Sequence, residues 1–248
     1  MKSEAGWNRA HAGGRASAIL LLLTAALWGC GAERIQHAVS LHYEGTDAPR
    51  LFEPSQAPTI IVAPFQDRRV GKENLGVYQW QRLTVELTPK GGTASAGVTE
   101  MARAFVERMG LKSASGDWDG EVASLPGIEG DYALYGEIIA LKFTGEGGLP
   151  DAKNRGTVSI SIRLGSRASR TVVRRDVEVT PDESRFILFD NRYEHIGQME
   201  RIIRRSVSRA IRDGLTDLVR RANAGTPGQT RQAPSSGEPN PFERFQRR

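Results

Sequence analysis

The spacing of apolar residues changes between residues 131 and 222, and this change constrains the fold most. Apolar residues alternate with polar ones in 158–164 and 170–179, and 131–143 is a long apolar-rich run; these stretches predict three antiparallel strands. From 197 to 222 apolar residues recur at every third or fourth position, which is typical of a helix with one apolar face. A meander of strands followed by a long amphipathic helix predicts an α+β fold.

The first half of the chain contains similar signals. Alternation at 35–43 and 82–87 predicts half-buried strands, and the β-branched run 59–63 predicts a fully buried central strand. Helical spacing at 95–109 ends at Gly110, which suits a left-handed C-terminal cap. We therefore expect one mostly antiparallel sheet with two helices packed on one face.

Three Gly-rich or Pro-rich stretches separate these elements. Residues 44–58 read as a loop or linker, 113–130 as an irregular segment, and 145–156 as a loose turn. Within the second stretch, Trp118 and Leu125 are the expected packing points.

The N-terminus has the layout of a secretory signal. A weakly basic start precedes the apolar run 18–28, which is shorter than the roughly 20 residues of a membrane-spanning helix. The run ends at Gly29–Cys30, and Cys30 is the only cysteine, which excludes an intramolecular disulfide and a cysteine-based metal site. A plain signal peptide with a chance cysteine and an uncleaved anchor are the alternatives to a lipid-modified cysteine.

These patterns divide the chain into four parts. We expect a lipoprotein signal peptide at 1–29 and a lipidated N-terminus, first strand and linker at 30–57. An α+β lipoprotein domain is expected at 58–222, and a disordered, basic, Pro/Gly/Ser-rich tail at 223–248.

The histidines do not form a metal-binding pattern. His11 lies in the signal, and His37 and His42 are five positions apart on a predicted strand, so they should face opposite sides. His195 precedes the last helix; a solvated loop residue is the favoured interpretation, and a pH-sensitive contact is the alternative. Because most sites need three or four convergent ligands, we expect no metal site.

The sequence contains no recognisable catalytic set. No serine lies in a Gly-x-Ser-x-Gly turn, and the phosphate-loop spacing of Gly71 and Gly76 lacks the Lys-Ser/Thr that should follow. Asp67, Arg68 and Arg69 follow a strand and could form a polar site, but a salt-bridged loop is the favoured interpretation. We expect a protein that is not an enzyme and has no cofactor; a hydrolase would need a groove with a shifted titratable group.

The net charge of +5 is spread along the chain. The densest basic stretch is the predicted helix 197–222, which has no aromatic residue, and this argues against nucleic-acid binding. We expect its arginines to form a solvated face with acidic partners in the same helix. Contact with anionic lipid headgroups is the alternative.

Several of these features together resemble a known group of proteins. Leu27-Trp28-Gly29-Cys30 resembles the lipobox of bacterial lipoproteins, and residues 131–138 read DYALYGEI. Residues 35–222 resemble small lipoproteins of the YajG type and the related auxiliary lipoproteins of ABC-type lipid transporters. The resemblance also depends on the strand 59–63, on Asp67-Arg68-Arg69 after that strand and on the last helix. The insertions at 91–97 and 113–130 and the basic tail depart from that pattern.

The resemblance implies that Cys30 carries palmitate and diacylglycerol, and that the mature chain is a membrane-anchored envelope lipoprotein facing the periplasm. Gly31 stands where enteric bacteria use aspartate for inner-membrane retention, which favours the outer membrane.

We expect a non-enzymatic binding or assembly module auxiliary to a transport system for lipids or apolar compounds. An envelope protein such as a transporter complex is the expected partner, and partner proteins or lipids are expected to dock on the sheet face that the helices leave open. The alternatives are a structural lipoprotein that links the membrane to the cell wall through 223–248, or a lipoprotein without a transport role.

Overall fold

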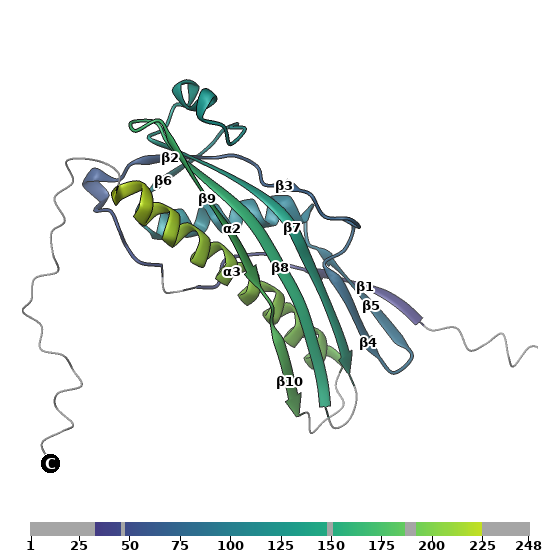
Figure 1. Ribbon diagram of the computed structural model, residues 1–248. Helices are drawn as coiled ribbons and strands as arrows, with labels where there is room; N and C mark the ends of the chain where they lie inside the picture. Colours follow the sequence, from purple (N-terminus) through teal and green to yellow (C-terminus); the bar gives the residue numbers. More distant parts are fainter. Residues whose placement is uncertain (1–32, 46–47, 148–150, 187–191, 225–248) are drawn as a thin grey trace, which may run out of the picture.

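Two long antiparallel strands, β7 (Tyr132–Gly147) and β8 (Asp151–Ser166), run along most of the molecule (Figure 1). The computed structural model describes residues 33–45, 48–147, 151–186 and 192–224. The other elements are β1 (Glu33–Val39), η1 (Pro54–Gln56), β2 (Thr59–Val62), β3 (Gln66–Asp67), β4 (Gly76–Trp80), β5 (Leu83–Pro89), α2 (Ala94–Arg108), β6 (Lys112–Ser115), η2 (Val122–Gly127), β9 (Thr171–Val179), β10 (Asp182–Phe186) and α3 (Arg192–Ala224).

β7 is the strand around which the 10-stranded sheet is built. It pairs with β8 in antiparallel fashion and with β2, β3 and β4 in parallel fashion. The pairs β1–β5 and β2–β6 are also parallel, whereas β4–β5, β8–β9 and β8–β10 are antiparallel. The α+β class is therefore confirmed, and the sheet is mixed rather than purely antiparallel.

β7 and β8 continue into the stretch 145–156, for which the sequence predicted a loose turn. A Cβ atom at Gly145 would overlap the ring of Tyr78, and one at Gly156 would overlap the ring of Phe143. Because glycine has no Cβ, these rings can lie directly against the strands. The glycines that suggested a turn are thus sites of close ring packing within the sheet.

The predicted helix at 95–109 is α2, and its ends have the expected chemistry. The Thr93 side chain accepts a hydrogen bond from the Ala96 N–H at 3.2 Å, which caps the N-terminus. At the other end Gly110 has a φ of 90°, and the Leu111 N–H donates to the Val106 carbonyl at 3.1 Å. This bond closes a Schellman motif, so the predicted C-terminal cap is confirmed.

α3 is longer than the predicted helix 197–222, because it begins at Arg192 and ends at Ala224. His195 therefore lies inside the first turns of the helix rather than in a loop. It is buried, with its ring centroid 5.8 Å from that of Tyr78. His195 precedes Met199 and Ile202 at helical spacing, so it shares their core-facing stripe.

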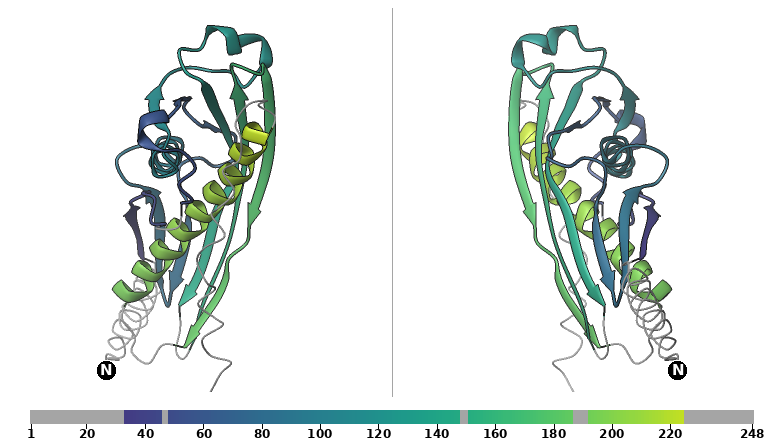
Figure 2. Two further views of the ribbon diagram at one scale, coloured as in Figure 1. Left: turned by 90° about the vertical axis from the view of Figure 1, so that its left-hand side faces the viewer. Right: turned by 90° about the vertical axis from the view of Figure 1, so that its right-hand side faces the viewer.

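Both helices pack on the same face of the curved sheet, as predicted (Figure 2). The main core lies between them and the sheet, and its largest fully buried side chains include Tyr78, Phe65, Phe105, Phe143 and Met101. A smaller cluster covers part of the opposite face, where the predicted packing points Trp118 and Leu125 lie with Ile128 over Ile61 and Tyr135. One end of the helix-free face is therefore already covered by residues 116–131.

The predicted strand 35–43 ends at Val39, and residues 40–45 cross the helices instead. The Tyr43 ring lies 5.2 Å from that of Phe105 on α2. Its neighbour Glu44 pairs with Arg204 on α3, with 2.6 Å between Oε1 and Nε. This segment therefore links the two helices.

Candidate functional site

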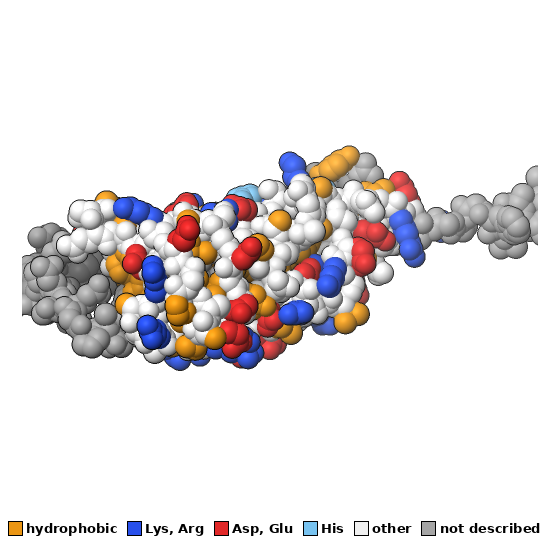
Figure 3. Space-filling view, turned by 90° about the horizontal axis from the view of Figure 1, so that it is seen from above, with side chains coloured by type: hydrophobic (Ala, Val, Ile, Leu, Met, Phe, Trp, Pro, Cys, Tyr) orange, Lys and Arg blue, Asp and Glu red, His pale blue; other side chains and the backbone are white. Residues whose placement is uncertain are grey.

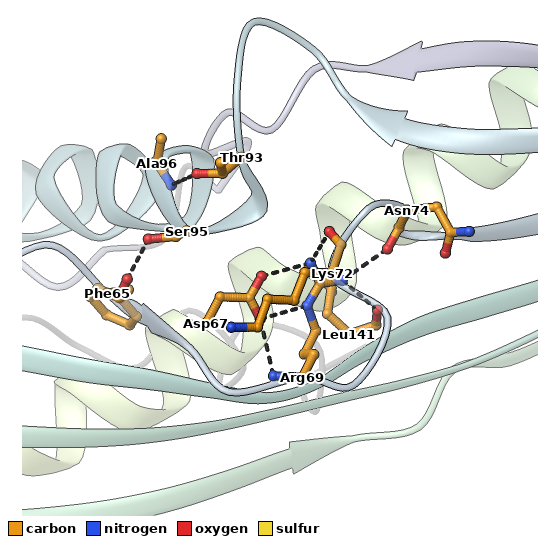
Figure 4. Close-up of polar contacts among 9 residues, drawn as sticks. All are labelled: Phe65, Asp67, Arg69, Lys72, Asn74, Thr93, Ser95, Ala96 and Leu141. Atoms are coloured by element: carbon orange, nitrogen blue, oxygen red, sulfur yellow. Dashed lines mark hydrogen bonds and ion pairs between the residues drawn. The ribbon is translucent and has the colours of Figure 1, made fainter.

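The Asp67-Arg68-Arg69 sequence lies where the chain leaves the sheet. In β3, Gln66 pairs with Glu137 and Asp67 with Ile138 of β7, and the Arg68 N–H donates to the Ile138 carbonyl at 3.0 Å. Residues 68–75 then form a loop that returns to the sheet at β4. We refer to this segment as the Arg69 loop (Figure 4).

Arg69 is buried, and its guanidinium group holds the loop together. Nε and Nη2 donate to the two carboxylate oxygens of Asp67 at 2.9 and 2.8 Å. Nη2 also donates to the Lys72 carbonyl, and Nη1 donates to the carbonyls of Asn74 and Leu141, at 3.0–3.1 Å. A guanidinium has five N–H groups, so each has an acceptor within the protein. Arg69 thus acts as a structural residue rather than as an anion ligand.

Asp67 is held in its charged form by this arrangement. Burial of the carboxylate acts to raise its pKa, but the hydrogen bonds and charge of Arg69 outweigh burial, and the pKa lies below the ordinary value of 3.8. The favoured interpretation of the sequence, a salt-bridged loop, is confirmed here: Arg69 pairs with Asp67 at 2.8 Å.

The N-terminus of α2 fixes the segment that enters this loop (Figure 4). The Thr99 Oγ1 accepts a hydrogen bond from the Phe65 N–H at 2.9 Å, and the Ser95 hydroxyl donates to the Phe65 carbonyl. The backbone is therefore tied to a helix before β3 and to β7 after it. Both connections limit the movement of the Arg69 loop.

The Arg69 loop presents an apolar side chain to solvent. Val70 is 103% exposed, and Ile139, at an irregularity in the register of β7 between Ile138 and Ala140, is 49% exposed. Beside them Arg68 pairs with Glu137 at 3.3 Å. We call the group of Arg68, Val70, Glu137 and Ile139 the Val70 surface. It combines two exposed apolar side chains with an ion pair.

The rest of the helix-free face is polar. Beyond the part covered by residues 116–131, strands β7, β8 and β9 direct mainly polar side chains outward, among them Lys142, Thr144, Arg155, Thr157, Arg174 and Asp176. The pKa of Asp176 lies below its ordinary value because Ser161 and Arg174 favour the charged carboxylate more than burial disfavours it. Such a face suits contact with a protein better than contact with acyl chains.

Four of the arginines of α3 have acidic partners in the same helix, as the sequence predicted: Arg204, Arg209, Arg212 and Arg221. Arg204 pairs with Glu200, and Arg221 with Asp217, in each case four residues apart. Two open grooves of about 610 and 680 Å³ flank this helix and share Arg205. Their linings mix both signs of charge and are open to solvent, so they offer no enclosed binding site.

The same mixture of charges is visible on the face shown in Figure 3, where acidic and basic side chains alternate over the surface. That face has no broad patch of one sign.

The remaining histidines contact α3 or its neighbours. His37 lies 3.4 Å from Glu200, and His42 lies 3.5 Å from Glu44. Within the described ranges, no group of three or more His, Cys, Asp and Glu residues is arranged to hold a metal ion.

Cys30, the signal 1–29 and the tail from residue 225 lie outside the described residues. Of the helices that the structure describes, none is both long and apolar enough to cross a membrane.

Val70 and Ile139 were not identified from the sequence. Val70 is a single apolar residue between Arg69 and Gly71 in a charged stretch, which is a weak signal that could have been noticed. Ile139 belongs to an apolar run in which every residue could be buried, but alternation along β7 places it on the helix-free face with Tyr135 and Glu137.

The sequence matches no protein-family model and no curated protein. Among solved structures, the fold is similar to that of a Xanthomonas campestris protein of family DUF330, with 11% identity over 77% of this chain and 99% of that chain and a TM-score of 0.47. It is also similar to the PelC dodecamer of Paraburkholderia phytofirmans, with 9% identity, coverage of 67% and 91%, and a TM-score of 0.34. A third similar structure is lipoprotein GNA1162 of Neisseria meningitidis, with 10% identity, coverage of 59% and 94%, and a TM-score of 0.26. At these values the likeness does not assign the chain to a family.

Proposed function

We propose that the protein is a non-enzymatic lipoprotein of the bacterial cell envelope that is anchored through Cys30 and binds a partner protein through the Val70 surface. The proposal includes a periplasm-facing domain, an outer-membrane rather than inner-membrane location, and a role auxiliary to a transport system. The observation that carries it is the Arg69 loop, which holds a fully exposed valine on a support with saturated hydrogen bonds.

The stiffness of the loop favours binding. Association costs free energy when flexible loops and side chains become ordered, and a loop that is already fixed avoids most of that cost. Val70 and Ile139 provide apolar area, while Arg68 and Glu137 provide directional polar contacts at its margin. Single exposed apolar residues are common on protein surfaces, so the argument depends on the two residues lying on one fixed support.

Anchoring is supported by the sequence Leu27-Trp28-Gly29-Cys30 and by the apolar run before it. Acyl chains add about 0.8 kcal/mol per buried CH₂ group, so more than one chain gives durable attachment. The transport role is supported only by the resemblance of residues 35–222 to auxiliary lipoproteins.

Labelling with palmitate tests the anchor. The wild-type chain should incorporate the label and fractionate with membranes, and Cys30→Ser should do neither. Since Cys30 is the only cysteine, no second thiol can take the label. Equal labelling, or equal membrane fractionation, of the two proteins would contradict the proposal.

Site-specific photo-crosslinking in cells tests the binding surface. A photoreactive residue at position 70 or 139 should capture the same protein, and one at position 122 should not. Val122 is a matched control because it is 48% exposed, against 49% for Ile139, and lies on η2, away from the Arg69 loop. Capture from all three positions, or from none, counts against the surface; a captured transporter subunit would support the transport role.

A further inference from the structure

The start of β1 lies at one end of the molecule together with two strand ends and the start of α3. Glu33 pairs with Leu83, Leu83 pairs with Trp80 across the β4–β5 turn, and Trp80 pairs with Gly147, the last residue of β7. Figures 1 and 2 show α3 beginning at this same end. We call it the anchor end.

The length of chain between Cys30 and β1 limits how far this end can lie from an anchored lipid. Cys30 and Glu33 are three residues apart, and extended chain spans at most about 3.6 Å per residue, so their separation is at most about 11 Å. If Cys30 carries acyl chains, as the proposed function requires, Glu33 must lie close to the bilayer surface. The short tether therefore selects the anchor end, rather than η2 or the Arg69 loop, to face the membrane.

The side chains at the anchor end suit the layer of lipid headgroups. Tyr193, near the start of α3, is 70% exposed, and Trp80 is partly exposed at the end of β4. Tyrosine and tryptophan are enriched at membrane–water interfaces because their rings are apolar and their N–H or O–H groups are polar. Charges of both signs lie here, with Arg34 and Arg82 against Glu33 and Glu146, so net charge adds little.

The β4–β5 turn consists of two polar residues, Gln81 and Arg82. Gln81 has a φ of 53°, a left-handed conformation that is uncommon for residues other than glycine. A tight hairpin turn usually places glycine, asparagine or aspartate there. Both residues are exposed, at the point where the chain turns from β4 into β5.

We infer that the anchor end docks on the headgroup layer of the bilayer that holds the lipid of Cys30, with Trp80 and Tyr193 in that layer. This inference rests on the proposed anchoring and adds an orientation to it: the β4–β5 turn faces the membrane, and η2 faces away from it.

Depth-dependent fluorescence quenching tests the orientation. After removal of residues 1–29 the chain keeps two tryptophans, Trp80 at the anchor end and Trp118 in the cluster under η2. Two lipidated variants are placed in phosphatidylcholine vesicles that carry spin labels on the headgroups. Trp118→Phe leaves only the fluorescence of Trp80, and Trp80→Phe leaves only that of Trp118. Trp80 should lose emission and Trp118 should not; quenching of Trp118 alone, or of neither, would overturn the inference.

A longer tether between the lipid and β1 distinguishes docking of the anchor end from simple closeness of Trp80 to the membrane. With a Gly/Ser insertion of about twenty residues between Gly31 and Ala32, whose flexible reach is roughly 25 Å, Trp80 should remain quenched. Adding Tyr193→Ser to that protein should release the end and restore Trp80 emission, whereas Val122→Ser should not. Loss of quenching on insertion alone would show that the end does not dock.

Two further measurements distinguish a failure of the orientation from a failure of the proposed function. Vesicle flotation and the mass of the N-terminal lipopeptide report on anchoring itself. A protein that floats without quenching refutes the orientation alone, and a protein that neither floats nor carries lipid refutes the proposed function. Unchanged circular dichroism shows that each variant is folded.

Discussion

Arg69 is a charged residue that the protein can bury because every N–H group has an acceptor. Two acceptors are the oxygens of Asp67, and three are backbone carbonyls at positions 72, 74 and 141. Removing such a residue leaves a carboxylate and several carbonyls without donors, and these groups then have a desolvation cost that nothing offsets.

Replacing Arg69 by leucine should therefore lower the free energy of unfolding by about 3 kcal/mol, measured by urea titration. Arg68 is the matched control. Its side chain pairs with Glu137 but is 58% exposed, so Arg68→Leu should lower the free energy of unfolding by less than about 1 kcal/mol. Arg69→Lys should also destabilise, since an ammonium cannot reproduce the planar set of donors. Similar losses for positions 68 and 69 would contradict this account.

The Asp67–Arg69 pair should also make stability depend on acid. The folded-state pKa of Asp67 lies below 3.8, so its contribution is complete above the unfolded pKa and is lost as pH falls from about 4 through the lower folded value. Asp67→Asn cannot titrate. On acidification from about pH 5 to about pH 2, wild type should lose more stability in urea titrations than this variant. Parallel losses would show that the Asp67 carboxylate does not contribute.

The Arg69 site was only partly predictable at the level of single residues. The sequence indicated a salt-bridged loop from three adjacent charges, and the structure confirms it. It could not show that Leu141, far along the chain, supplies an acceptor, because this depends on the path of β7. Likewise His195 was expected in a loop, and the earlier start of α3 buries it instead.

Among the elements, those with a clear apolar pattern were predictable. The runs at 59–62 and 132–143 and both helices were found because their side chains report which face is buried. β6 consists of Lys-Ser-Ala-Ser and has no such pattern; it exists because the edge of β2 offers backbone partners. β10 is similarly polar and pairs with β8. β4 depends on a parallel pairing with β7, which is distant in sequence.

Close packing within the sheet gives a prediction for β7. A Cβ atom at Gly136 would overlap the ring of Phe65, so Gly136→Ala should lower the free energy of unfolding by about 1–3 kcal/mol. Gly127→Ala on η2 is the control, because no atom lies within 4 Å of the Cβ position there, and the change should stay within about 0.5 kcal/mol. Equal thermal midpoints for wild type and Gly136→Ala would show that the Phe65 ring can move aside.

At the scale of the whole molecule, the fold depends on the last turns of α3, which are part of the hydrophobic core. Leu218 is fully buried and Val219 is 2% exposed, so the helix is needed almost to its end at Ala224. A chain of residues 31–224 should unfold within about 0.5 kcal/mol of the chain 31–248, whereas a chain ending at residue 215 should lose several kcal/mol. Urea titration of the three proteins checks this; a stable chain 31–215 would contradict the assignment of the core.

The length of β7 has a consequence for how such a molecule can change in evolution. Sixteen residues at about 3.3 Å each make a strand of roughly 50 Å, which sets how far η2 stands from the anchor end. Because neighbouring side chains point to opposite faces, removing a single residue anywhere except at the irregularity between Ile138 and Ala140 would turn the core side chains beyond it outward. Residues must be removed in pairs, from β7 and β8 together. Away from that irregularity, the length of the domain can therefore change only in steps of about 7 Å, and homologues with a shorter or longer domain should differ there by an even number of residues in each strand.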